Sequence, residues 1–305
     1  MKVLILGSNG LVGSSLVRKF NSNSLFNEVI ASNRNSLDLF NLENVKQEIS
    51  KTQPNYIINA AAKVGGILAN NTYRTEFILE NLKININLLE ALIPFEKINL
   101  INLGSSCIYP LNAPNPIKED YIMTGQLEKT NSPYAMAKLT AIELGNSIKQ
   151  QHGHKIINLM PTNLYGPNDN FSDKDSHVIP GLIGRLHKAK IENNKIFEVW
   201  GTGAPLREFL YVDDLADAIS FVIENNINDE LINIGSNEEI SIKDLVANLI
   251  DTIEFDGDVV FNDKFPDGNP RKLLDSSKIF DYGWKPKISI EEGLQKTYQW
   301  YLDNN

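Results

Sequence analysis

The chain has 305 residues, of which 42% are hydrophobic and 22% are charged, and its formal net charge is −9. This length and composition fit a soluble globular protein of two domains, or of one domain with an attached lobe. The acidic balance argues against broad contact with nucleic acid or with an anionic membrane. The apolar runs are too short for a signal peptide or for a membrane span of ~18 residues. Cys107 is the only cysteine, so no intramolecular disulfide can form, and we expect a cytoplasmic protein.

Short strands and amphipathic helices alternate through the first half of the sequence. The apolar segments rich in Ile, Leu and Val have the length of buried strands, and the segments between them have helical periodicity. Such alternation predicts a parallel sheet with helices on both faces, which is a doubly wound α/β fold. The expected strands are 2–6, 28–31, 56–59, 99–103 and 155–160, and the expected helices are 11–20, 45–51, 73–93 and 133–150.

The pattern loosens after Pro161, where a loop rich in Asn, Asp and Ser begins. We expect a nucleotide-binding domain over 1–164, to which a segment of about 197–235 returns. A smaller α/β lobe, interleaved with this domain, is expected over 165–196 and 236–305. The elements expected after Pro161 are helices over 178–192, 241–251 and 291–302 and strands over 231–235 and 259–261.

A glycine-rich loop follows the first expected strand and opens the first expected helix. Glycines in this position allow a tight turn, approach of the backbone to a pyrophosphate, and close packing of helix on sheet. A tight turn without a ligand is the alternative, but the strand before and the helix after favour dinucleotide binding. The GxxGxxG spacing resembles that of the extended short-chain dehydrogenase/reductase superfamily, which implies a Rossmann fold. The expected cofactor contacts in this loop are Gly7, Ser8, Asn9, Gly10, Leu11, Val12 and Gly13.

The residues after the second strand discriminate between NAD and NADP. A carboxylate there binds the ribose hydroxyls in many NAD sites, whereas an arginine accommodates the 2′-phosphate of NADP. Residues 31–34 read Ala-Ser-Asn-Arg, with no acidic residue. Arg34 can form charge-assisted hydrogen bonds to a phosphate, although a solvated surface arginine is the alternative. We therefore expect NADP(H) as the cofactor.

A Tyr-x-x-x-Lys motif stands at the start of an expected helix. Ser132 and Pro133 have the pattern of an N-cap followed by proline at the first helical position. Tyr134 and Lys138 stand at i and i+4, hence on one helix face. The ammonium is expected to lower the phenol pKa from ~10, so that Tyr134 can exchange a proton with a carbonyl or carbinol oxygen. Ser105, at the end of the fourth strand, can donate to the same oxygen, and this combination with the glycine loop predicts an active site.

Longer blocks of the sequence resemble one family of this superfamily, the GDP-L-fucose synthases. These enzymes are 3,5-epimerases and 4-reductases that act on GDP-4-keto-6-deoxy-D-mannose. The resemblance runs nearly from end to end, and the blocks around Cys107, His177 and Met160 are its most specific parts. The blocks are AAAKVGGI (60–67), NNTY (70–73), GSSCIYP (104–110), MPTNLYGP (160–167), SHVIP (176–180), VWGTG (199–203), REFLYVDD (207–214) and PRKLLD (270–275).

The resemblance implies a role for each matching residue. It implies that Tyr134 donates the proton in reduction with support from Ser105 and Lys138, and that Cys107 and His177 are the base and acid of epimerisation. A buried hydrophobic role for Cys107 and a structural hydrogen-bonded role for His177 are the alternatives. Further NADP contacts are implied at Arg34, Leu103, Gly104, Ser105, Lys138, Pro161, Thr162, Asn163, Leu164 and His177, and GDP-sugar contacts at Arg185, Trp200, Arg207, Asp267 and Lys272.

Several features limit or extend these expectations. Members of the family often carry a basic residue where this chain has Asn9, which leaves Arg34 with less help on a 2′-phosphate. The three cations expected at the GDP-sugar could be solvated surface residues, and Trp200 could be a core residue. No metal site is expected, because His152 and His154 lie in a polar turn without a thiol or clustered carboxylates. The resemblance also implies a homodimer joined through the helices expected over 73–93 and 133–150.

The chemistry of a 4-keto sugar agrees with these residue types. The ketone acidifies the C–H bonds at C3 and C5, and inversion there needs a base on one face and an acid on the other. A thiol and an imidazole titrate close enough to neutrality for this exchange. The nearest alternatives are a nucleotide-sugar 4-epimerase or 4,6-dehydratase, which would hold NAD tightly through each cycle. A regulator that senses a cofactor without chemistry would have little reason to keep Ser105, Tyr134 and Lys138 together.

Overall fold

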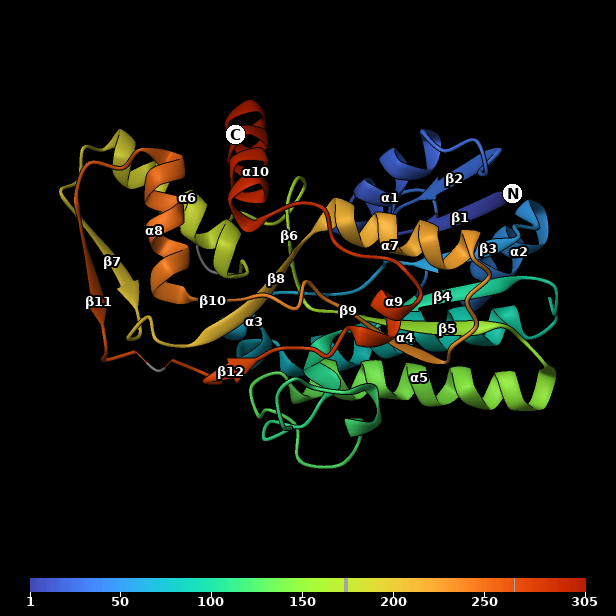
Figure 1. Ribbon diagram of the computed structural model, residues 1–305. Coiled ribbons are helices and arrows are strands. Elements are labelled where there is room, and N and C mark those ends of the chain that lie inside the picture. Colours follow the sequence, from blue (N-terminus) through green and yellow to red (C-terminus); the bar gives the residue numbers. More distant parts are fainter. Residues whose placement is uncertain (173–174, 266) are drawn as a thin grey trace.

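The computed structural model describes residues 1–172, 175–265 and 267–305. Figure 1 shows a large sheet flanked by helices and, beside it, a smaller lobe that holds β7, β11 and α8. The strands of the large sheet pair in parallel in the order β2-β1-β3-β4-β5-β9. These strands are β1 (Lys2–Leu6), β2 (Glu28–Ser32), β3 (Tyr56–Asn59), β4 (Asn99–Leu103), β5 (Ile156–Pro161) and β9 (Leu231–Ile234). The predicted doubly wound fold is confirmed.

Strand β1 shows why this sheet is covered on both faces. Val3 and Ile5 pack into one apolar cluster, whereas Leu4 and Leu6 pack into another. Successive side chains of a strand point to opposite faces, so an entirely apolar strand needs a helix layer on each side. The first cluster contains residues of α1 (Leu11–Asn21) and α7 (Val212–Glu224), and the second contains residues of α2 (Leu42–Thr52), α4 (Arg74–Leu92) and α5 (Ser132–His152).

The smaller lobe is assembled around strand β8, which pairs with β6, β10 and β12, while β7 pairs with β11. We expected residues 197–235 to return to the first domain, but they are divided between the two parts of the molecule. Strands β7 and β8 pair outside the large sheet, whereas α7 packs against α1 and β9 joins the large sheet. The elements of the lobe are β6 (Asn163–Tyr165), α6 (Val178–Ile191), β7 (Ile196–Trp200), β8 (Leu206–Tyr211), β10 (Glu239–Ser241), α8 (Ile242–Ile253), β11 (Asp258–Asn262), β12 (Arg271–Lys272) and α10 (Ile290–Asn304).

Short helical turns lie in the connections. Within the described ranges, no helix has the length and apolar composition needed to cross a bilayer. The short turns are α3 (Ile67–Thr72), α9 (Ser277–Asp281), η1 (Ser106–Ile108) and η2 (Glu119–Tyr121).

The start of α5 differs in one detail from the expectation. The helix begins at Ser132 and its N-cap is Asn131, because the Ala135 N–H donates to the Asn131 carbonyl at 3.0 Å. The predicted N-cap role of Ser132 is therefore wrong. The Ser132 hydroxyl instead accepts a hydrogen bond from Arg74 of α4 at 3.2 Å, which joins the starts of the two helices.

Candidate active site

The glycine loop follows β1. Strand β2 pairs with one side of β1 and β3 with the other, so the order of the strands reverses at this point of the sheet. Ligands of open α/β sheets bind at such a point, beyond the carboxyl ends of the strands. Gly7 has a φ of +81°, and a Cβ there would come within 2.9 Å of the Ala61 backbone. A Cβ on Gly13 would overlap the Gly7 carbonyl, whereas a Cβ on Gly10 would make an ordinary contact with the Gly7 carbonyl oxygen at 3.6 Å. Gly10 has no side chain to cap α1, so the N–H groups of the first turn remain available to an anion. A dinucleotide pyrophosphate fits this loop.

The glycine loop is joined to the turn that carries Arg34. The Gly7 N–H donates to the Ser32 carbonyl at 2.9 Å, and the Asn33 amide donates to the Asn9 side chain at 3.4 Å. Arg34 is 78% exposed at this turn. Its guanidinium is therefore accessible to a ligand on the side of the loop where the adenosine ribose of a dinucleotide belongs.

A second group of expected residues meets at the carboxyl end of β4. The buried Lys138 ammonium donates to the Leu103 carbonyl at 2.7 Å, which ties α5 to the end of this strand. The Ser105 hydroxyl accepts the Cys107 N–H at 3.4 Å, so its own proton can still be donated to a ligand oxygen. The Lys138 Nζ lies 5.7 Å from the centre of the Tyr134 ring. The structure thus brings together the predicted serine, cysteine, tyrosine and lysine.

The protonation of Tyr134 differs from the expectation. Burial raises the pKa of Tyr134, and negative charge on Cys107 raises it further. The predicted lowering by Lys138 is wrong for this structure, because the phenolate loses its hydration here while the ammonium is engaged by Leu103. Burial also lowers the pKa of Lys138 to about 8, an effect that charge on Cys107 opposes. Tyr134 is therefore protonated at neutral pH, which is the form that can donate a proton.

Cys107 is buried in the 3₁₀ turn that follows β4. Burial raises the pKa of its thiol, while Lys272, a hydrogen bond with Ser105, and Lys138 lower it in that order. The neutral thiol therefore dominates at neutral pH, and the thiolate fraction increases as pH rises. The influence of Lys272 also shows that the smaller lobe reaches this end of β4.

His177 stands immediately before α6, next to the loop that follows β3. The Gly66 N–H donates to the Asp175 carbonyl at 2.9 Å, which holds the two segments together. The residue as a whole is exposed to solvent, although neighbouring protein atoms desolvate its imidazole. These surroundings lower the pKa of His177, while a hydrogen bond with the Gly65 backbone raises it. The neutral imidazole is thus the favoured form.

The remaining expected cofactor contacts lie on the same edge of the sheet. Gly104 follows β4 directly, and its N–H donates to the Leu159 carbonyl of β5 at 2.9 Å. The Thr162 N–H donates to the Ile234 carbonyl of β9 at 3.0 Å. These contacts place Leu103, Gly104, Pro161, Thr162, Asn163 and Leu164 at the carboxyl ends of β4 and β5 or in β6.

The five residues expected at the GDP-sugar all lie in the smaller lobe. Trp200 is 53% exposed, which excludes a core role, and it stacks on Phe265 with ring centroids 4.9 Å apart. The Arg185 guanidinium lies 5.3 Å from the Trp200 ring. Arg207 and Lys272 are direct partners in the pairing of β8 with β12. Arg185, Trp200 and Phe265 thus form a group of one cation and two aromatic rings, and Arg207 and Lys272 lie side by side elsewhere in the same lobe.

Asp267 has a structural contact that the sequence did not indicate. Its carboxylate accepts hydrogen bonds from the Thr202 N–H at 2.7 Å and from the Thr202 hydroxyl at 2.8 Å. It thereby supports the turn between Gly201 and Gly203, both of which have positive φ. Asp267 therefore shapes the loop beside Trp200 in addition to any contact with a ligand.

Two further residues of this lobe were missed by the sequence analysis. Phe265 extends the aromatic surface of Trp200, and only its place near the family block at 270–275 could have indicated it. Glu208 is fully buried, and its carboxylate accepts the N–H groups of Leu274 at 3.0 Å and Asn237 at 2.8 Å. An acidic residue within an apolar strand was the available signal for this role, which joins three segments of the lobe.

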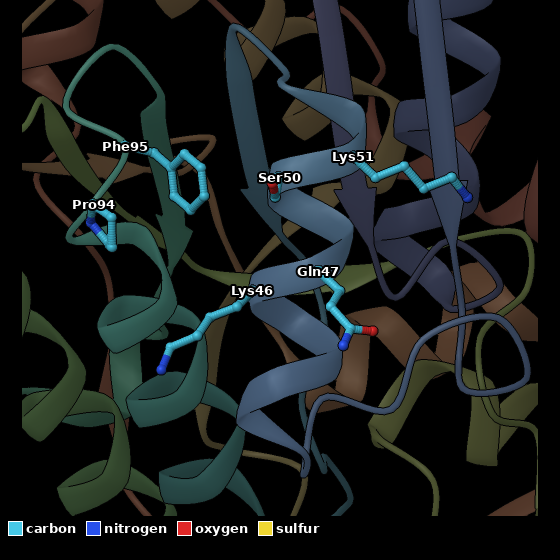
Figure 2. Close-up of a pocket in the computed structure, with 6 residues that line it drawn as sticks. All are labelled: Lys46, Gln47, Ser50, Lys51, Pro94 and Phe95. Carbon is cyan, nitrogen blue, oxygen red and sulfur yellow. The ribbon is translucent and has the colours of Figure 1, made fainter.

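A separate hollow lies between α2 and the segment after α4 (Figure 2). The α2 helix ends just before β3 begins, and the segment after α4 leads into the start of β4. The hollow is therefore at the amino ends of the strands, on the opposite edge from the glycine loop. Its lining residues are Lys46, Gln47, Ser50, Lys51, Pro94 and Phe95.

His152 and His154 of the polar turn are not arranged as ligands of a metal ion. His154 is buried, and its Nε2 lies 3.0 Å from the Ile93 carbonyl oxygen. Among the residues that the structure describes, no group of three or more His, Cys, Asp or Glu side chains could hold a metal ion.

The fold and the Ser-Tyr-Lys arrangement define a dinucleotide-dependent enzyme class. The sequence pattern of the NAD dependent epimerase/dehydratase family matches residues 3–235. The chain therefore belongs to this family.

Full-length relatives narrow the family further. GDP-L-fucose synthase 1 of Arabidopsis thaliana is 46% identical over 303 residues, which cover 99% of this chain and 94% of that protein. GDP-L-fucose synthase of Escherichia coli (strain K12) is 41% identical over 312 residues, covering 99% of this chain and 97% of that protein. A crystal structure of a GDP-L-fucose synthetase from Naegleria fowleri bound to NADP superposes with a TM-score of 0.91 at 29% identity, covering 99% and 92% of the two chains. These matches place the chain in the GDP-L-fucose synthase branch of the family.

Proposed function

We propose that this protein converts GDP-4-keto-6-deoxy-D-mannose to GDP-L-fucose by 3,5-epimerisation followed by NADPH-dependent reduction at C4. The observation that carries the proposal is the meeting of two sets of groups at the end of β4. One set is Ser105, Tyr134 and Lys138, which suits reduction of a ketone. The other is Cys107, with the charge of Lys272 beside it. A simple reductase needs only the first set.

The residues divide the chemistry into proton transfers at carbon and at oxygen. In epimerisation, the minor thiolate form of Cys107 removes the proton from C3 or C5, and the minor imidazolium form of His177 donates a proton to the other face of the resulting enolate, which leaves a neutral thiol and a neutral imidazole. In reduction, NADPH held at the glycine loop and Arg34 would supply a hydride to C4. Tyr134 then donates its phenolic proton to O4, while Ser105 donates a hydrogen bond to the same oxygen. Lys138 holds the end of β4 through the Leu103 carbonyl and lies beside the Tyr134 ring.

The two parts of the chain serve different ligands in this proposal. Residues 1–164, with α7 and β9, bind NADP(H). The smaller lobe binds the GDP-sugar through Arg185, Trp200, Arg207 and Lys272, with Asp267 shaping the loop beside them. Two phosphates call for cations, and the aromatic surface of Trp200 and Phe265 suits a base or a sugar face. A reducing compartment such as the cytoplasm suits the buried free thiol.

Incubation with GDP-4-keto-6-deoxy-mannose and NADPH in deuterated water tests the proposed reaction. NADPH should be oxidised, and mass and proton spectra should show GDP-L-fucose with deuterium at C3 and C5. A 4-epimerase or 4,6-dehydratase would instead carry stoichiometric NAD and need no added NADPH. Oxidation of NADPH without deuterium in the sugar would remove the epimerase half of the proposal.

Arg34→Ala should raise the KM for NADPH about tenfold and leave the KM for NADH within about twofold, as expected for loss of one charge-assisted contact to phosphate. Arg34 is exposed at the turn beside the glycine loop, so its loss leaves the fold unchanged. Initial rates with each cofactor measure the effect. An equal loss with both cofactors would show that Arg34 supports the loop instead.

We also propose that the protein is a homodimer joined through α4 and α5. These helices pack side by side, and apolar side chains are exposed on both. Leu79 of α4 is 49% exposed and Met136 of α5 is 46% exposed. Apolar surface on adjacent helices is typical of a protein interface.

The double variant Leu79→Glu, Met136→Glu should halve the molar mass in solution, because charges buried in an apolar interface are strongly unfavourable. Light scattering after gel filtration measures this mass. Leu302→Glu, at an equally exposed apolar position on α10, should leave the mass unchanged. A wild-type mass of one chain, or an unchanged mass of the double variant, would contradict the proposed interface.

A further inference from the structure

The tertiary structure brings a carboxylate to Arg34 that the local sequence lacks. Glu80 of α4 lies with one oxygen 3.8 Å from the Arg34 guanidinium and the other 3.0 Å from the Lys63 ammonium. Only 26% of the Glu80 side chain is exposed, compared with 78% for Arg34. Glu80 thus stands between two cations at the turn where NAD-binding proteins tend to place an acid.

Glu80 is held in this place by its neighbour in the helix. The buried Asn81 side chain accepts the Lys63 N–H at 3.0 Å and donates to the Lys63 carbonyl at 3.0 Å. The backbone of Lys63 is therefore fixed to α4, and its ammonium meets Glu80 from the same segment. The carboxylate is therefore fixed against Lys63 and largely shielded from solvent, whereas the Arg34 side chain that contacts it is largely exposed.

We propose that Glu80 is a specificity-determining residue that weakens the preference for NADPH over NADH. This inference rests on the proposed use of NADPH. With Glu80 ionised, the group formed with Arg34 and Lys63 carries one net positive charge, and without it the group carries two. A 2′-phosphate approaching Arg34 must compete with the carboxylate and is repelled by it, whereas the uncharged 2′-hydroxyl of NADH is not.

Equilibrium binding of NADPH and of NADH, followed by the fluorescence of the reduced nicotinamide, tests the proposal without any sugar substrate. Glu80→Gln keeps the shape of the side chain and removes its charge. It should tighten NADPH binding about three- to tenfold at low salt and change NADH binding less than about twofold. The gain should shrink at high ionic strength, because exposed charges are screened. Glu90→Gln, the same charge change at an exposed position near the other end of α4, should alter neither affinity.

The dependence on Arg34 completes the test. In an Arg34→Ala background, Glu80→Gln should improve NADPH binding less than in the native background. Arg34, the cation for which the carboxylate and the 2′-phosphate compete, is then gone. An unchanged NADPH to NADH ratio, or weaker NADPH binding through loss of a support for Arg34, would overturn the inference. Failure of the native protein to bind NADPH at all would instead contradict the proposed function, so the two failures are distinct.

Discussion

Tyr134→Phe is expected to reduce the rate of ketone reduction by about 10³-fold, within the range for loss of a general acid. The raised pKa of Tyr134 keeps the phenol protonated at neutral pH, so the native enzyme always has this proton to give. Phenylalanine keeps the ring and its edge contact with Phe77 but cannot protonate O4. Single-turnover oxidation of NADPH with the epimerised ketone would measure the loss.

Proton exchange at carbon separates this role from a general loss of structure. In Tyr134→Phe, deuterium should still enter C3 and C5, because that step belongs to other residues. Tyr282→Phe removes a phenol that bonds to Asp229 on the surface and should leave both activities intact. A Tyr134→Phe variant that reduces at the native rate would take the tyrosine out of the mechanism.

Cys107→Ser is expected to reduce deuterium exchange at C3 and C5 by about 10²-fold or more, as for a lost general base. Serine has a similar size, and its hydroxyl stays protonated where a thiol can ionise. The fold and NADPH binding should persist, because the turn of Cys107 is held by backbone contacts to Ser105 and Ser106. With Tyr134 intact, the variant should reduce the ketone without inversion and yield a 6-deoxy sugar of the original stereochemistry.

The pH dependence of exchange offers a second measurement on Cys107. Burial raises the pKa of the thiol, so the thiolate that removes the proton is a minor form at neutral pH. Exchange by the native enzyme should therefore increase as pH rises above neutrality, and the residual exchange of Cys107→Ser should lack this increase. Native-like exchange in the variant at every pH would leave Cys107 with a packing role only.

Much of the first domain was determined by local sequence. Strands β1, β3 and β4 begin and end at the predicted residues. Each is a short apolar run, and the turn residues on either side of it define where the strand ends. The glycine loop was also predictable from the sequence. The positive φ of Gly7 and the close approach of the Gly7 carbonyl to Gly13 favour glycine at both positions. The Tyr-x-x-x-Lys spacing placed Tyr134 and Lys138 on one face, because helical geometry alone decides that.

Other features depended on contacts between distant segments. Strand β8 and helix α7 were not predicted, since nothing local shows that 206–211 pairs with β6, β10 and β12. Trp200 could have been a core residue by composition, and only the packing of the lobe left it exposed beside Phe265. The pKa of Tyr134 moved in the opposite direction from the expectation, because burial, which raises it most, is a property of the folded chain. The carboxylate next to Arg34 is that of Glu80, which comes from α4. The net charge around Arg34 was therefore decided by the tertiary structure, because residues 31–34 contain no acidic residue.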